Sequence, residues 1–114
     1  MQWDKTLGGN GDDILLSVQQ TSDNGFILGG RSYSSISGDK TEDSKGLHDY
    51  WVVRLDANGI KLWDRTIGGN ADDFLQSVQQ SFDGGFILGG WSHSSISGDK
   101  TEDSKGYQDY WVVK

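Results

Sequence analysis

An all-β fold is what this sequence predicts, and three features of the chain support the prediction. The 114 residues include 17 glycines and no proline, and short runs of Val, Ile and Leu alternate with turns rich in Asp, Asn and Gly. No window shows a sustained 3.6-residue apolar period, so we expect almost no helix. A unit of about 60 residues also occurs twice, because only 13 of the 52 positions differ when residues 3–54 are aligned with residues 63–114. The chain therefore consists of two copies of one β unit.

We expect each unit to supply four strands joined as an antiparallel meander. In the first copy the predicted strands are residues 14–20, 26–32, 49–55 and 60–66. The first hairpin turn contains Asp23, which accepts backbone N–H bonds, and Gly25, which supplies a positive φ. Before the fourth strand, Asn58 and Gly59 are expected at the positive-φ positions of a second hairpin turn. A long polar loop, residues 33–48, joins the second and third strands.

Four-stranded sheets repeated at this interval with Gly-rich turns predict the blades of a β-propeller. The expected organisation is a closing strand at residues 1–6, a first repeat of four strands at residues 7–66 and a second repeat of three strands at residues 67–114. Two blades do not close a ring, so we expect a homo-oligomer, either a homotrimer with six blades or a homotetramer with eight. The long blade and its Trp- and Phe-rich interfaces favour eight. In this arrangement the strand at residues 1–6 of one chain completes the last blade of the next chain.

Several motifs resemble those of known propeller families. The turn at residues 21–26 and its copy at residues 81–86 resemble the Asp-box of sialidase-like propellers, and the doublets Gly29-Gly30 and Gly89-Gly90 are similar to those of kelch blades. Nearly the whole chain resembles tandem repeats of the form WDKTxGG…DGGFIxGG…DYWVVKLDxNG, which occur in large secreted or surface proteins of bacteria. This resemblance implies propeller blades, an extracellular or cell-surface location within a larger protein, and no catalytic residues.

Charge and cysteine content exclude several classes of function. The formal net charge is −7, which repels phosphate backbones and anionic membranes and so argues against nucleic-acid or lipid partners. The chain has no cysteine, which excludes disulfides, thiol nucleophiles and Cys-ligated zinc. No apolar stretch has the length of a signal peptide or a membrane span, so an export signal is expected outside this sequence. An acidic surface suits cations.

The acidic loop of each repeat is a candidate Ca²⁺ site. Asp39, Thr41 and Asp43 place oxygen ligands at alternate positions, and Asp49 follows, a spacing typical of flexible loops that wrap calcium. The second copy repeats this set at Asp99, Thr101, Asp103 and Asp109. The alternative is that these side chains form turn bonds to the backbone while the neighbouring Lys and Glu are solvated. The sequence leaves both interpretations open.

Trp91 and Arg31 are the candidate ligand-binding residues. They occupy the same repeat position, directly after the Gly-Gly doublet, where the second strand leads to the face that carries the long loop. A flat aromatic ring at that place suits stacking on a sugar, and the alternative is partial burial against the loop. The other four tryptophans lie inside predicted strands, where we expect them to pack between blades.

The predicted role is self-assembly and binding without catalysis, with a glycan or a protein recognised on one ring face. His48 and His93 occupy non-equivalent repeat positions, and the chain has neither a Ser-His-Asp arrangement nor a phosphate-binding loop. The alternative is a sialidase-like or other propeller hydrolase or lyase with an acidic site at the ring mouth. Such an enzyme breaks the repeat at its catalytic residues, whereas here the acidic positions repeat faithfully, so we predict that the protein is not an enzyme.

Overall fold

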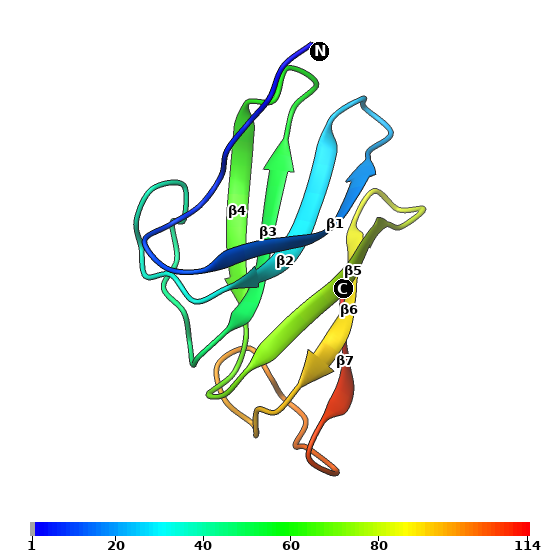
Figure 1. Cartoon of the computed structure of the whole chain (residues 1–114). Helices are drawn as coiled ribbons and strands as arrows, with labels where there is room; N and C mark the ends of the chain where they lie inside the picture. Colours follow the sequence, from blue (N-terminus) through cyan, green and yellow to red (C-terminus); the bar gives the residue numbers. More distant parts are fainter. Residues whose placement is uncertain (1) are drawn as a thin grey trace.

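The protein is all-β in a computed structural model that describes residues 2–114, a stretch without helix (Figure 1). Its strands are β1 (Asp13–Gln20), β2 (Phe26–Ser32), β3 (Asp49–Leu55), β4 (Lys61–Ile67), β5 (Asp73–Gln80), β6 (Phe86–Ser92) and β7 (Asp109–Val113). The predicted fold class is confirmed at this level. Over the same residues, the structure offers no helix that is long and apolar enough to cross a membrane.

The strands form two antiparallel sheets that repeat the same pairing. The first sheet has the order β1-β2-β3-β4 and the second has the order β5-β6-β7, each a simple meander. Gly29 pairs with Val52 in the first sheet, as Gly89 pairs with Val112 in the second, and the bulge in the middle of β1 recurs in β5. The strand bounds of the first copy agree with the prediction to within one residue. The sequence repeat is therefore also a repeat of backbone structure.

The positive φ angles of the hairpin turns fall partly on other residues than predicted. In the β1–β2 turn the positive φ belongs to Asn24, at 70°, and not to Gly25, while Gly84 holds the matching position of the β5–β6 turn at 83°. In the β3–β4 turn Gly59 has a φ of 82°, and the prediction that Asn58 shares a positive φ is wrong. Asparagine tolerates the left-handed region because its short polar side chain bonds locally, which explains why it replaces glycine at one of these turns.

The two sheets pack against each other through one apolar core. The fully buried members of this core are Ile27, Tyr50 and Val52 from the first sheet and Leu75, Val78 and Leu88 from the second. Gly29 permits the close approach, because a Cβ atom there would lie 3.2 Å from Cγ1 of Val78. The Tyr50 hydroxyl also donates a 2.8 Å hydrogen bond to the backbone carbonyl of Trp111, which ties the sheets together. We call the two faces that meet here the inner faces and the opposite ones the outer faces.

Candidate functional site

The outer faces of the two sheets carry the same residues as the core between them. Leu75 on the inner face of the second sheet is 0% exposed, whereas its counterpart Leu15 on the outer face of the first sheet is 55% exposed. Tyr50 on the inner face of the first sheet is 0% exposed, whereas Tyr110 on the outer face of the second sheet is 95% exposed. The same contrast holds between Val78 and Val18 and between Val52 and Val112. Each outer face is therefore one half of the contact that joins the sheets, open at these positions, although Trp51, Val53 and Leu55 on the outer face of the first sheet are buried in a second apolar cluster with Leu7.

A set of polar contacts centred on Asp64 holds β4 at the edge of the first sheet. The Asp64 carboxylate accepts hydrogen bonds from the indole N–H of Trp51 at 3.0 Å and from the backbone N–H and hydroxyl of Thr41 at 3.0 and 2.8 Å. Lys61 Nζ lies 3.0 Å from the same carboxylate. Burial raises the pKa of Asp64, but these hydrogen bonds outweigh burial and hold the pKa below its ordinary value. Asp64 is therefore an ionised anchor for the edge strand.

The acidic loop reaches the same strand through Thr66. The Glu42 carboxylate accepts the backbone N–H of Thr66 at 2.7 Å, and Lys45 Nζ donates to the Thr66 carbonyl at 2.8 Å. The loop that the sequence presents as a calcium candidate thus binds the fourth strand of its own sheet.

The second sheet has the same loop and the same edge, but no strand occupies the place of β4 within residues 2–114. Thr101, Glu102, Trp111 and Val112 instead line an open groove of about 490 Å³ beside β7. Among the described residues, neither the indole N–H of Trp111 nor the hydroxyl of Thr101 has a hydrogen-bond partner like the one that Asp64 provides in the first sheet. We call this cavity the edge groove.

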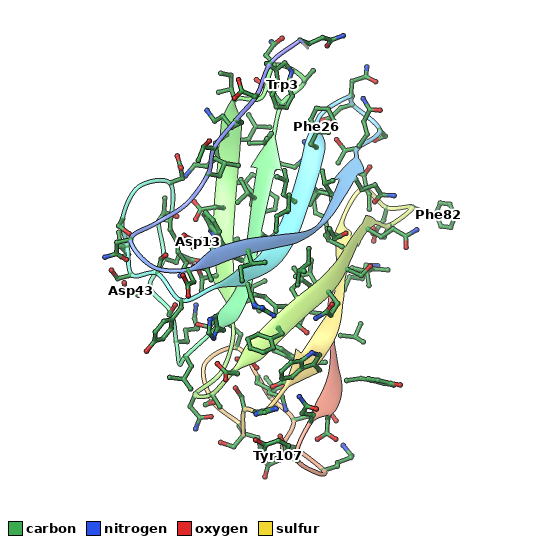
Figure 2. All side chains as sticks on the ribbon, viewed as in Figure 1. Trp3, Asp13, Phe26, Asp43, Phe82 and Tyr107 are labelled. Atoms are coloured by element: carbon green, nitrogen blue, oxygen red, sulfur yellow. The ribbon has the colours of Figure 1, made fainter. Side chains whose placement is uncertain are left out.

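The N-terminal segment packs on the first sheet as β4 packs on the second. Trp3 lies edge-on to Phe26 with ring centroids 5.6 Å apart, and Trp63 of β4 lies in the same way against Phe86 at 6.1 Å. Figure 2 shows Trp3 and Phe26 at the same end of the first sheet, and in Figure 1 the segment runs from the β3–β4 turn to the start of β1. Residues 2–7 pair with no strand in this structure.

The backbone that follows this segment repeats the same docking. Gly8 and Asp39 are joined by two hydrogen bonds. The Gly8 N–H donates to the Asp39 carboxylate at 3.0 Å, and the Asp39 N–H donates to the Gly8 carbonyl at 2.9 Å. Gly68 exchanges the same pair with Asp99, at 3.0 and 2.8 Å. The N-terminal segment therefore occupies, on the outer face of the first sheet, the place that β4 occupies on the inner face of the second.

The predicted calcium ligands have separate partners in the structure. Each predicted carboxylate accepts a backbone N–H: Asp39, Asp43 and Asp49 in the first loop, and Asp99, Asp103 and Asp109 in the second. Thr41 donates to Asp64, and Thr101 lines the edge groove. Over residues 2–114, no three His, Cys, Asp or Glu side chains lie close enough together to hold a metal ion. The calcium site stays a prediction.

The predicted ligand residues Trp91 and Arg31 meet on the ring of Phe74. Trp91 lies edge-on to Phe74 with centroids 4.2 Å apart, and the guanidinium carbon of Arg31 lies 4.4 Å above the same ring. Further rings extend the contact in both directions, from Phe74 through His48 to Tyr33 and from Trp91 through His93 to Tyr107. We call these six side chains the aromatic row: Tyr33, His48, Phe74, Trp91, His93 and Tyr107.

Every member of the aromatic row stands at a position where the two repeats differ. Phe74, Trp91 and Tyr107 replace non-aromatic residues of the first copy, and the other three members fall at two further differing positions. Five of the 13 positions that differ between the repeats are therefore brought together in the aromatic row, a feature that the repeat does not duplicate among the described residues. Sequence reasoning named Trp91 and Arg31 but missed their neighbours, although the change from aliphatic or charged to aromatic residues was the signal that could have found them.

Comparison with protein-family models and with curated proteins finds no match for this chain.

A buried pair of carboxyl groups, Asp49 and Asp73, also lies between the sheets. Asp73 accepts hydrogen bonds from the hydroxyls of Ser92 and Ser94, whereas Oδ1 of Asp49 is buried with no partner in the described part of the chain. Burial and the neighbouring charge of Asp73 raise the pKa of Asp49 to about 7. The pair therefore holds a proton near neutral pH.

Proposed function

We propose that the chain is a structural module that assembles with copies of itself into a closed β-propeller ring, with each sheet as one blade. The match between the outer faces carries this proposal. The contact that buries Leu75 and Tyr50 inside the chain would, repeated between copies, bury Leu15 and Tyr110 in the same way. Uncovered apolar faces of this kind promote aggregation, and a second copy offers the complementary face for each of them.

Such a contact is head-to-tail, because the outer face of the first sheet meets the outer face of the second sheet of another copy. Head-to-tail contacts close into a ring when the rotation between copies divides the circle. Two sheets per chain require an even number of blades. We therefore propose a homotrimer with six blades or a homotetramer with eight, and prefer eight.

The mass of the chain in solution tests this proposal. Light scattering after gel filtration is expected to give three or four times the chain mass of 12.5 kDa. Val112→Glu places a charge on the outer face of β7, where the side chain is exposed in the single chain, and is expected to leave a folded monomer. A wild-type chain that stays a stable monomer across the accessible concentrations would refute the ring.

Ile96→Glu is the matched control for this variant. Ile36, the counterpart of Ile96 in the first repeat, is 59% exposed although the inner face of the first sheet is covered by the second sheet. Ile96 itself is 60% exposed. This repeat position therefore lies outside the contact between sheets. Ile96→Glu is therefore expected to assemble like the wild type. Equal assembly of Val112→Glu and Ile96→Glu would show that the outer face of β7 is not the interface.

We further propose that the aromatic row recognises a ligand, with a glycan as the first candidate and a protein as the alternative. The supporting observation is that the diverged repeat positions gather there, around a Phe74 ring flanked by Trp91 and Arg31. The role is binding, not catalysis. Glycan titrations followed by tryptophan fluorescence are expected to saturate, and Trp91→Ala is expected to abolish the signal.

The control for the aromatic row is Phe82→Ala, which removes an exposed ring that Figure 2 shows far from Tyr107. This control should bind the glycan unchanged. Saturable quenching that survives Trp91→Ala would exclude Trp91 from the site.

A further inference from the structure

We infer that the edge groove is the binding site for residues 3–7 of a second copy, and that Asp4 is the side chain that anchors this segment in the groove. The inference rests on the proposed assembly and names the segment and the residue through which one copy completes the second sheet of another. It follows from a comparison of the filled edge of the first sheet with the open edge of the second.

The N-terminal segment has the sequence that the groove accepts. Residues 3–7 read WDKTL, and the occupant of the equivalent place in the first sheet, residues 63–67 within β4, reads WDRTI. The two differences, Lys for Arg and Leu for Ile, keep the charge and the apolar character. The walls of the two places match as well, because residues 99–106 repeat residues 39–46 without a difference.

Asp4 supplies the hydrogen-bond acceptor that the edge groove lacks. In the first sheet, Asp64 satisfies the Trp51 indole and both polar groups of Thr41. Asp4 holds the repeat position of Asp64, and its exposed side chain has no partner among residues 2–114. In the edge groove of another copy, the Asp4 carboxylate would accept hydrogen bonds from the indole N–H of Trp111 and from the backbone N–H and hydroxyl of Thr101. The acceptor and the donors, which lack such partners in the single chain, would then satisfy each other.

The backbone supports the same placement. In the first sheet Val53 pairs with Asp64, Val52 with Arg65 and Trp51 with Thr66. Transferred to the second sheet, this register pairs Val113 with Asp4, Val112 with Lys5 and Trp111 with Thr6 of the other copy. An added strand of this kind gains main-chain hydrogen bonds along the open edge, as in other cases of strand addition.

The N-terminal segment is already held where a docking copy would meet it. The packing of Trp3 on Phe26 and the exchange between Gly8 and Asp39 fix this segment on the outer face of its own first sheet. When the second sheet of another copy covers that face, its β7 edge arrives beside residues 3–7. Because the segment needs little further ordering, its binding loses little conformational entropy.

Asp4→Ala tests the anchor, with Ile96→Ala as the control that shortens a side chain outside both the edge groove and the contact between copies. Because hydrogen bonds to a charged group stabilise by about 1.5 to 3 kcal/mol, Asp4→Ala is expected to raise the dissociation constant between copies by about ten- to a hundredfold. Sedimentation velocity over a dilution series measures this constant. Ile96→Ala should leave this dissociation constant unchanged, and neither substitution should alter the unfolding midpoint of the dilute monomer.

A disulfide between copies tests the register. The chain has no cysteine, so Lys5→Cys combined with Val112→Cys introduces the only two thiols. Mild oxidation is expected to join copies covalently, giving a closed species of three or four chains on a non-reducing gel. Lys5→Cys combined with Tyr110→Cys places the thiols out of register and should join copies far more slowly, because disulfides need Cα atoms within about 7 Å.

The outcomes separate this inference from the ring itself. A wild-type chain that never assembles overturns the proposed function. Normal assembly of the Asp4→Ala variant, or failure of the Lys5→Cys and Val112→Cys thiols to form a disulfide in a chain that assembles, overturns the inference but not the proposed ring. Weakened assembly of Asp4→Ala together with the register-dependent disulfide supports both.

Discussion

Replacing Leu75 by alanine is expected to lower the free energy of unfolding by about 2 to 5 kcal/mol. Leu75 is 0% exposed and lies in the core between the sheets, against Gly29 of the neighbouring sheet. The loss combines the transfer free energy of the removed methyl groups with the cost of the cavity that they leave, because the Leu75 side chain fills the space above Gly29, which has no side chain of its own to close it.

Leu15→Ala is the same substitution at the equivalent position of the first repeat. Leu15 is 55% exposed, so less than half of its side chain is removed from water in the single chain. With about 1.5 to 3 kcal/mol for a fully buried leucine, the expected loss in the monomer is about 1 kcal/mol. In the assembled ring Leu15 would be buried like Leu75, and the loss should rise to the same size as that of Leu75→Ala.

Urea unfolding at several protein concentrations measures both values. At high dilution the midpoint of Leu75→Ala should fall well below that of Leu15→Ala, whereas at concentrations where the chain assembles the two should converge. Equal losses in the dilute monomer would show that the two sheets do not pack as described. A Leu15→Ala loss that stays small in the assembled protein would show that the outer face of the first sheet is not an interface.

Three further predictions concern single side chains. Asp64→Ala should lower the free energy of unfolding by about 3 to 5 kcal/mol in urea, because it leaves the buried Trp51 N–H without an acceptor and the Lys61 ammonium group without its carboxylate. A loss as small as that caused by a substitution at an exposed site would contradict the anchoring role of Asp64. Asn24→Ala should lower stability by about 1 kcal/mol because Asn24 has a positive φ, whereas Asn24→Gly should be tolerated in thermal unfolding, as glycine is at the matching turn. Since the pKa of Asp49 is raised to about 7, the folded state holds a proton that the unfolded state releases near pH 4, so the contribution of Asp49 to stability should be largest below about pH 4 and be lost as the pH rises to about 7, by at most about 1.4 kcal/mol per pH unit. Asp49→Asn should flatten this decline, and an unchanged pH profile of the urea midpoint would contradict the assignment.

Local patterns in the sequence determined the strands and their order. Alternating apolar runs and Asp- and Gly-containing turns are properties of a few neighbouring residues, so the strands of the first copy could be placed to within one residue. The positive-φ positions of the turns were harder to assign, because Asn24 takes the left-handed conformation that the prediction gave to glycine, and composition alone does not reveal which residue does so.

Only the tertiary structure decided which member of each repeated pair is buried. Leu15 and Leu75 have nearly the same sequence neighbours and the same strand pairing, yet one is exposed and the other is not, because burial depends on whether another sheet lies against that face. The surroundings of Asp39 and Asp49 are a second case, since the backbone N–H of Gly8 meets the Asp39 carboxylate, and the Asp73 carboxyl group comes close to Asp49, only after folding. The aromatic row is a third, because rings from positions 33 to 107 become neighbours only when the two sheets pack together.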